Sequence, residues 1–95
     1  MPFQLTVSGQ QTPPRVVPLR PGSNLLGRSP RADIVLVAPL VSRTHAKIVL
    51  EAGNLVNLFD LDSHNGTFVN GEKVRSRAIN AGDSVYIGGF RLTRF

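Results

Sequence analysis

Turn-forming residues interrupt this chain so often that no long helix is expected. Clusters of glycine, proline, asparagine or serine recur roughly every 6–12 residues, and no stretch of ten or more residues shows an uninterrupted apolar period of about 3.6 residues. Between the clusters, apolar and polar residues alternate, which is the pattern of a half-buried strand. These features predict an all-β sandwich or barrel of about ten short strands with little or no helix.

The clearest alternation lies at residues 46–51 and continues at 56–58 after a Gly53-Asn54 turn, which predicts a β-hairpin. A second tight turn is predicted at Asn70-Gly71, a pair that accepts positive φ. Pro18 restricts the run at 15–19 to an edge or a bulge. The other expected strands are 2–8, 24–28, 33–36, 67–69, 72–74, 84–87 and 90–95, with turns at 12–14, 21–23 and 81–83 and a basic loop at 75–77.

Length and composition favour one small domain over the whole of residues 1–95. Because the chain stops on its last expected strand, we expect this domain to be part of a larger protein. There is no cysteine, so disulfides and thiolate metal sites are excluded, and a cytoplasmic location is favoured. The longest apolar run, residues 34–41, is broken by Pro39 and is too short to cross a bilayer, so no membrane partner is expected.

The charge of the chain indicates an anionic partner. Eleven Lys and Arg face six Asp and Glu, giving a formal charge of +5, and nine of the eleven are arginine, the residue suited to bidentate grips on phosphate or carboxylate. Nucleic acid is not favoured, because the arginines are scattered along the chain and one Tyr with five Phe offers few stacking platforms.

Several polar residues fall in predicted loops, and in an all-β domain the loops at one end of the sheets converge. Two arginines, a hydroxyl and an amide are the groups that a phosphate attached to a peptide backbone needs. The candidate residues for such a site are Arg28, Ser42, Arg43, His64, Asn65 and Thr67.

Catalytic and metal sites are not supported by the same residues. In an extended chain Ser42 and His45 would point to opposite faces, and no acid stands in the motif to orient the imidazole, so a hydrolase dyad is rejected and His45 is interpreted as structural. Asp60, Asp62 and His64 depart from the spacing of a calcium loop, and two histidines without cysteine give no zinc site. No catalytic residue, metal or cofactor is therefore predicted.

Five ordered motifs resemble those of the forkhead-associated (FHA) family. They are Gly27-Arg28, Ser42-Arg43-x-His45, Asp60-Leu61-x-Ser63-x-Asn65-Gly66-Thr67, Asn70-Gly71 and Gly82-Asp83. The resemblance implies a β-sandwich of about 10–11 short, mostly antiparallel strands that binds phosphothreonine through loops at one end. It also implies that Arg28 and Ser42 hold the phosphate with Arg43 and His64 beside them, and that Asn65 bonds the peptide backbone. The positions implied to support the loops are Gly27, His45, Gly66, Thr67, Asn70 and Gly71.

The function expected from this sequence is non-catalytic binding of phosphothreonine in partner proteins, in Ser/Thr-kinase signalling, by a domain that is monomeric when isolated. The alternative is a phosphate-independent interaction or dimerisation module on the same fold, in which Arg28, Ser42 and Asn65 would have no role.

Overall fold

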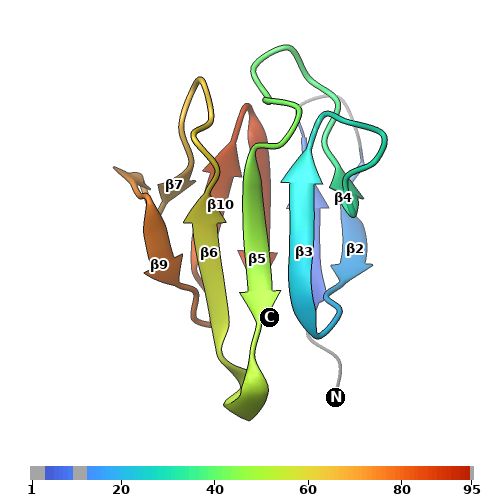
Figure 1. Ribbon diagram of the computed structural model, residues 1–95. Helices are drawn as coiled ribbons and strands as arrows, with labels where there is room; N and C mark the ends of the chain where they lie inside the picture. Colours follow the sequence, from blue (N-terminus) through green and yellow to red (C-terminus); the bar gives the residue numbers. More distant parts are fainter. Residues whose placement is uncertain (1–3, 10–12, 95) are drawn as a thin grey trace.

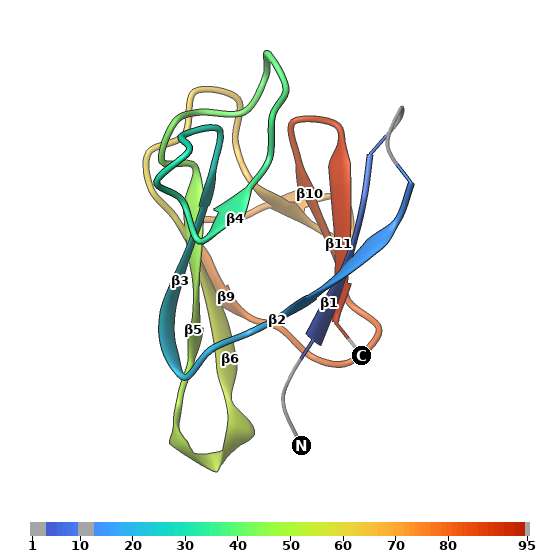
Figure 2. The same ribbon diagram turned by 90° about the vertical axis from the view of Figure 1, so that its right-hand side faces the viewer.

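Two β-sheets pack face to face in the computed structural model, which describes residues 4–9 and 13–94 (Figure 1; Figure 2). One sheet has six strands, in the spatial order β2 (Arg15–Pro18), β1 (Gln4–Ser8), β11 (Phe90–Arg94), β10 (Ser84–Ile87), β7 (Phe68–Val69) and β8 (Glu72–Lys73). The other has five, in the order β4 (Ile34–Val35), β3 (Gly22–Gly27), β5 (Ala46–Leu50), β6 (Val56–Asp60) and β9 (Ser76–Ala78). β3 and β4 are parallel and the other paired strands are antiparallel. Among the described residues, helix is limited to the three-residue 3-10 turn η1 (Ala52–Asn54), so the all-β prediction is confirmed.

The core lies between the two sheets and is formed by the inward side chains of alternating strands. In the β5–β6 hairpin, Ile48 pairs with Leu58 and both are fully buried, as the alternation predicts. From the six-stranded sheet, Leu5, Ile87 and Leu92 face them across the core. Burial of such side chains, each contributing about 1.5–3 kcal/mol, is the main force that holds the sheets together.

Two predicted boundaries were wrong. Gly22 and Ser23, expected in a turn, already belong to β3, and Gly22 begins that strand with a φ of +87°. Ser76 and Arg77, expected in a basic loop, belong to β9, which pairs with β6 and places Arg77 opposite Leu58. The β9 sequence has no apolar alternation, so its strand character comes from the free edge of β6 and not from local pattern. Its polar side chains in turn suit an edge strand, which must not recruit further chains.

Other elements agree with the sequence or are shorter than expected. β2 lies at a sheet edge, as Pro18 requires, and Asn70-Gly71 forms the β7–β8 turn with φ of +50° and +88°. The strand expected at 33–36 is reduced to Ile34–Val35, and that at 67–69 to Phe68–Val69. The predictions at residues 2–3, 12 and 95 lie outside the described residues.

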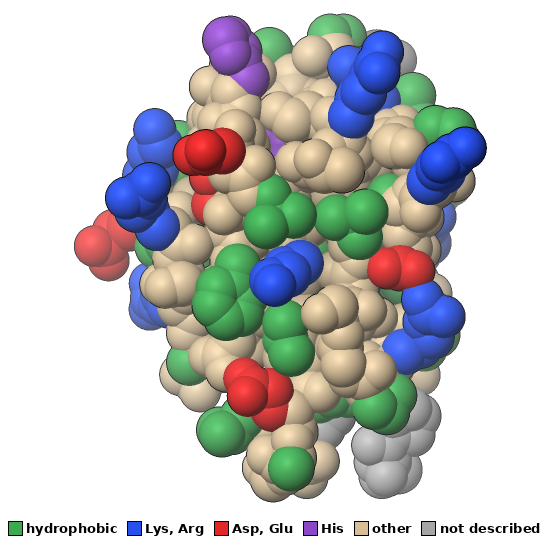
Figure 3. Space-filling model, in the orientation of Figure 1, with side chains coloured by type: hydrophobic (Ala, Val, Ile, Leu, Met, Phe, Trp, Pro, Cys, Tyr) green, Lys and Arg blue, Asp and Glu red, His purple; other side chains and the backbone are tan. Residues whose placement is uncertain are grey.

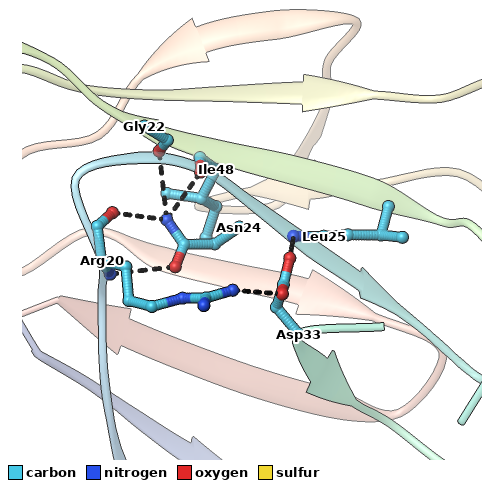
Figure 4. A network of polar contacts seen from close by, with 6 residues as sticks. All are labelled: Arg20, Gly22, Asn24, Leu25, Asp33 and Ile48. Atoms are coloured by element: carbon cyan, nitrogen blue, oxygen red, sulfur yellow. Dashed lines mark hydrogen bonds and ion pairs between the residues drawn. The ribbon is translucent and has the colours of Figure 1, made fainter. Parts of the chain in front are cut away.

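A polar network fixes the corner between β2 and β3 (Figure 4). The buried Asn24 side chain accepts a hydrogen bond from Arg20 N–H and donates to the carbonyls of Arg20, Gly22 and Ile48 at 2.9–3.2 Å. Asp33 accepts a bond from Leu25 N–H at 2.7 Å and forms an ion pair with Arg20. Since Asp33 ends the loop between β3 and β4, this network anchors the segment that carries Arg28.

Candidate functional site

The loops that carry the predicted polar residues meet at one end of the sandwich, at the top of Figure 1. They are the β3–β4 loop (28–33), the β4–β5 loop (36–45) and the β6–β7 loop (61–67). The β10–β11 turn lies against the second of these, because a Cβ added at Gly88 would come within 2.6 Å of Val41 Cγ2. Residues far apart in sequence are thereby brought to one surface.

The β3–β4 and β4–β5 loops are joined backbone to backbone beside Gly27. Arg28 N–H donates to the Ser42 carbonyl at 2.9 Å, and Ser29 N–H donates to the Arg43 carbonyl at 3.2 Å. A Cβ at position 27 would lie 1.9 Å from the Arg43 carbonyl oxygen, so glycine is required by this close approach. The contact places Arg28 directly beside Ser42.

His45 joins the β4–β5 loop to the β6–β7 loop from inside the protein. Its side chain is fully buried, its Nδ1 accepts a hydrogen bond from Ser42 N–H at 3.0 Å, and its Nε2 lies 2.9 Å from the Gly66 carbonyl. Because Ser42 N–H can only donate, Nδ1 is unprotonated and Nε2–H donates to Gly66, which defines a neutral imidazole.

The structure also excludes a catalytic Ser42–His45 dyad, but for a different reason from the one expected from the sequence. Residues 42–45 are not an extended strand, so the argument from opposite faces does not apply. Instead, both imidazole nitrogens are occupied by backbone groups, and the Ser42 hydroxyl oxygen accepts a bond from His64 N–H at 3.0 Å. The imidazole is therefore not positioned to take the Ser42 proton.

A depression of about 220 Å³ lies where the three loops meet. Its polar lining comes from Arg28, Ser42, His64 and Asn65, and its apolar lining is Pro39, Leu40 and Val41. Four of the five predicted ligand-binding residues thus border one pocket. The fifth, Arg43, has an exposed side chain and is not among the lining residues, although its carbonyl forms the junction with the β3–β4 loop.

The polar groups in this pocket have donors to spare for a ligand. Arg28 Nε donates to the Val41 carbonyl at 3.0 Å, which orients the guanidinium, while its Nη groups have no acceptor among the described residues. Asn65 Nδ2 donates to the Leu40 carbonyl at 3.1 Å, which leaves its second N–H and its carbonyl oxygen for other partners. The Ser42 hydroxyl accepts from His64 N–H and retains its own hydrogen for donation.

Asp60 organises the β6–β7 loop, a role that was not predicted from the sequence although Asp60 begins the motif that ends at Thr67. Its carboxylate accepts hydrogen bonds from Ser63 N–H, the Ser63 hydroxyl and the Thr67 hydroxyl, the last at 2.7 Å. Burial raises the pKa of Asp60, but these hydrogen bonds outweigh it, and the pKa lies below its ordinary value. Thr67 is fully buried, and the Ser63 hydroxyl also accepts a bond from Gly66 N–H at 3.0 Å.

The Asn70-Gly71 turn supports a different part of the molecule. Asn70 donates to the Asp83 carboxylate at 2.9 Å and accepts a bond from Ser84 N–H at 3.0 Å, so it joins the β7–β8 turn to the start of β10. Asp83 also accepts a bond from Asn80 N–H, and these bonds lower its pKa. This part was recognisable in sequence only as the separate motifs Asn70-Gly71 and Gly82-Asp83.

The site has the hydrogen-bond donors of an anion-binding surface. On the face shown in Figure 3, Lys and Arg side chains are scattered among acidic and apolar ones. Within residues 4–9 and 13–94 there is no group of three or more His, Asp or Glu placed to hold a metal ion. In the same part of the chain, no helix is long and apolar enough to span a membrane.

Comparison with known proteins places these features in a family. The FHA domain model matches residues 24–88. The glycogen accumulation regulator GarA of Mycobacterium tuberculosis is 50% identical over 66 residues, which cover 70% of this chain and 40% of GarA. The chain thus spans less than half the length of that curated relative.

Solved structures agree over nearly the whole chain. The FhaA FHA domain, crystallised in complex with the intracellular domain of Rv3910, has a TM-score of 0.89 and 32% identity, with coverage of 98% of this chain and 99% of that one. An FHA domain from a structural and functional study of phosphothreonine-dependent FHA interactions has a TM-score of 0.85 and 33% identity, with coverage of 96% and 94%.

Proposed function

The chain belongs to the FHA domain family, and we propose that it is a non-catalytic module that binds phosphothreonine in partner proteins. The observation that carries this proposal is the convergence of Arg28, Ser42 and Asn65, from three separate loops, on one pocket. A charged fork, a hydroxyl and an amide in one pocket match a phosphate that is attached to a peptide backbone.

Each residue has a distinct role in the proposed complex. The Nη groups of Arg28 donate charge-assisted hydrogen bonds to the phosphate oxygens, and the Ser42 hydroxyl donates a third. His64 borders the pocket and supplies a further contact to the phosphate. Asn65 pairs with the peptide backbone beside the phosphothreonine through the amide groups that Leu40 leaves free.

The apolar side of the pocket gives a reason for preferring threonine to serine. Leu40 and Val41 line the pocket beside Ser42, and the γ-methyl group of phosphothreonine would contact them. Phosphoserine lacks this methyl group and would lose the corresponding burial, about 0.8 kcal/mol for one carbon.

The expected affinity is moderate. Three charge-assisted hydrogen bonds at about 1.5–3 kcal/mol each sum to about 4.5–9 kcal/mol before the costs of association, so we expect a micromolar or weaker Kd, about −8 kcal/mol at most. Such affinity suits reversible recruitment of substrates or partners downstream of Ser/Thr kinases in the cytoplasm. The complex of FhaA with the Rv3910 intracellular domain shows that a related FHA domain assembles with another protein.

The deciding experiment is a calorimetric titration with a phosphothreonine peptide library, with phosphoserine and unphosphorylated peptides as controls. Arg28→Ala is expected to abolish measurable binding. Arg31→Ala is the matched control, because Arg31 is an exposed arginine of the same loop that does not line the pocket. Partner binding that persists without phosphate, or that survives Arg28→Ala, would favour the phosphate-independent interaction module.

A further inference from the structure

The outer face of the six-stranded sheet carries a row of cationic and aromatic side chains that the proposed function does not use. Lys73 of β8 pairs with Phe68 of β7, and Phe68 pairs with Tyr86 of β10. Tyr86 in turn pairs with Arg91 of β11. These four residues, called the outer row below, do not border the phosphate pocket.

Burial along the strands shows that the outer row points away from the core. Val69 is fully buried, whereas its neighbour Phe68 is half-buried. Tyr86 lies between two buried residues and keeps 41% of its surface exposed. Because paired residues share one face of a sheet, Lys73 and Arg91 lie on the same outer face, and both are exposed. The outer row is therefore open to solvent.

The two cations at the ends of the outer row are held in place but not neutralised. Arg91 donates from Nε and Nη2 to the Ser84 hydroxyl at 3.2 and 3.1 Å, and its Nη1 has no acceptor among the described residues. The stem of Lys73 passes beside Gly66, because a Cβ added there would lie 3.0 Å from Lys73 Cε and 3.3 Å from Phe68 Cε1. Within the described part of the chain, neither cation forms an ion pair. Both charges are therefore available to a partner.

No carboxylate of the six strands lies on their outer face. The strands of this sheet contain one acid, Glu72, which pairs with the inward-facing Val69. Asp83, which precedes β10, is bound by Asn70 and by Asn80 N–H. By contrast, acidic side chains lie among the cations on the outer face of the other sheet, which faces the viewer in Figure 3. The outer row thus has charges of one sign and complements an acidic partner.

The spacing of the outer row indicates the shape of that partner. Lys73 and Arg91 lie on strands three steps apart, and at about 4.8 Å per step their Cα atoms are roughly 14 Å apart. An extended chain covers about 13 Å in four residues, and its residues i, i+2 and i+4 point to one side. Carboxylates at i and i+4 would therefore meet the two cations, while residue i+2 would lie over Phe68 and Tyr86.

We propose that the outer row is a second binding surface, which takes an extended acidic segment with carboxylates at i and i+4 and an apolar residue at i+2. The segment needs no phosphate, so this surface acts independently of the phosphate pocket and goes beyond the proposed function. The apolar side chain gains by leaving water to cover the two rings, and tyrosine and arginine are enriched among the residues that dominate binding at protein interfaces. Single-stranded nucleic acid is a poorer match, because the outer row offers two cations and one exposed ring to a backbone with a charge at every nucleotide.

The test is an NMR titration of the isotope-labelled domain with the blocked, unphosphorylated peptide Gly-Ser-Glu-Ser-Leu-Ser-Glu-Ser-Gly. We expect saturable binding in the roughly millimolar range, with the largest amide shifts at Phe68, Tyr86 and Arg91 and little change at Ser42 and Asn65. A second peptide of the same composition, Gly-Ser-Glu-Leu-Ser-Ser-Glu-Ser-Gly, turns its leucine to the other side. It should bind at least about three-fold more weakly.

Two charge reversals test the outer row against general electrostatic attraction. Lys73→Glu should weaken binding of the first peptide at least about five-fold, because it removes an attraction and adds a repulsion. Lys47→Glu is the matched control, because it makes the same change of charge on the outer face of the other sheet, and affinity should stay within about two-fold. Tyr86→Ser should abolish the preference for the first peptide over the second. Thermal melting of each variant verifies that it is folded.

Three results would overturn the inference while leaving the proposed function intact. They are no saturable shift in the outer row, equal binding of the two peptides, and an equal loss of affinity in Lys73→Glu and Lys47→Glu. Tighter binding of a single-stranded oligothymidylate to the outer row at physiological salt would assign this surface to nucleic acid instead. Failure of the proposed function, which is measured separately with phosphopeptides and Arg28→Ala, would leave this inference unaffected.

Discussion

Replacing His45 by alanine tests whether the binding loops are held together from inside the protein. The imidazole is fully buried and bonds to Ser42 N–H and to the Gly66 carbonyl, which belong to different loops. Alanine removes both bonds and leaves two backbone groups without their partner. It also leaves an empty volume in a region that is closely packed.

The expected loss of stability can be worked out from these contacts. Each lost hydrogen bond costs about 0.5–1.5 kcal/mol, a buried polar group left without a partner costs about 1–3 kcal/mol, and the cavity adds to both. Because neighbouring groups relax, we expect a total of about 3–4 kcal/mol. At about 4–8 °C per kcal/mol for a domain of this size, Tm should fall by at least roughly 12 °C.

The measurement is urea unfolding together with thermal melting, with His64→Ala as the matched control. His64 is exposed and borders the pocket, so its replacement should change stability by less than about 0.5 kcal/mol while weakening phosphopeptide binding slightly. His45→Gln, which can keep one of the two bonds, should fall between His45→Ala and the unmodified protein. If His45→Ala melts within about 3 °C of the unmodified protein, the structural role assigned to this histidine is wrong.

Four further predictions follow from the same geometry. Gly27→Ala should lower the free energy of unfolding, measured in urea, by about 2–4 kcal/mol, because the added Cβ would lie 1.9 Å from the Arg43 carbonyl oxygen. An unchanged free energy of unfolding would contradict this close approach. Ser42→Ala and Asn65→Ala should each cost about 1–3 kcal/mol of phosphopeptide affinity in calorimetry with little change in melting, and equal affinity would remove them from the site. Because the pKa of Asp60 is lowered in the folded protein, its stabilising contribution is complete above its unfolded pKa of about 3.8 and is lost as the pH falls through the lower folded value. Between about pH 5 and pH 2, the free energy of unfolding of Asp60→Asn should therefore fall less than that of the unmodified protein. Asp62→Gly should raise Tm by a few degrees, because Asp62 has a φ of +56° that glycine adopts without strain, and a lower Tm would contradict this argument. The same substitution should tighten phosphopeptide binding, because it removes a negative charge two residues from His64.

The sequence predicted best the elements that are specified locally. The β5–β6 hairpin and the Asn70-Gly71 turn each combine an unambiguous pattern with turn residues that tolerate positive φ. Pro18 restricted β2 to an edge or a bulge, and the structure places it at an edge. In each case, the residues that decide the structure are neighbours in the chain.

Features that depend on distant partners were not predictable in this way. β9 is a strand because β6 offers it an unpaired edge, and nothing in Arg75-Ser76-Arg77 shows that edge. The sequence does not distinguish Asn24 from other polar strand residues, because its role depends on hydrogen bonds to the carbonyls of Arg20 and Ile48 that only the fold creates. The position of Arg43 outside the pocket lining also depends on how the β4–β5 loop crosses Gly27.

The link between the loops and the core also supports the proposal that so small a pocket binds a ligand. Gly27 and His45 join the three loops to one another, and Asp60 orders the β6–β7 loop, before any ligand arrives. Ordering flexible side chains on binding costs about 0.5–1.5 kcal/mol each, and preorganisation avoids much of that cost. In the proposed complex, this preorganisation would bring the affinity of a few charge-assisted hydrogen bonds closer to the micromolar range. It follows that substitutions at these three positions should weaken binding and lower stability together, whereas changes at Ser42 or Asn65 should affect binding alone.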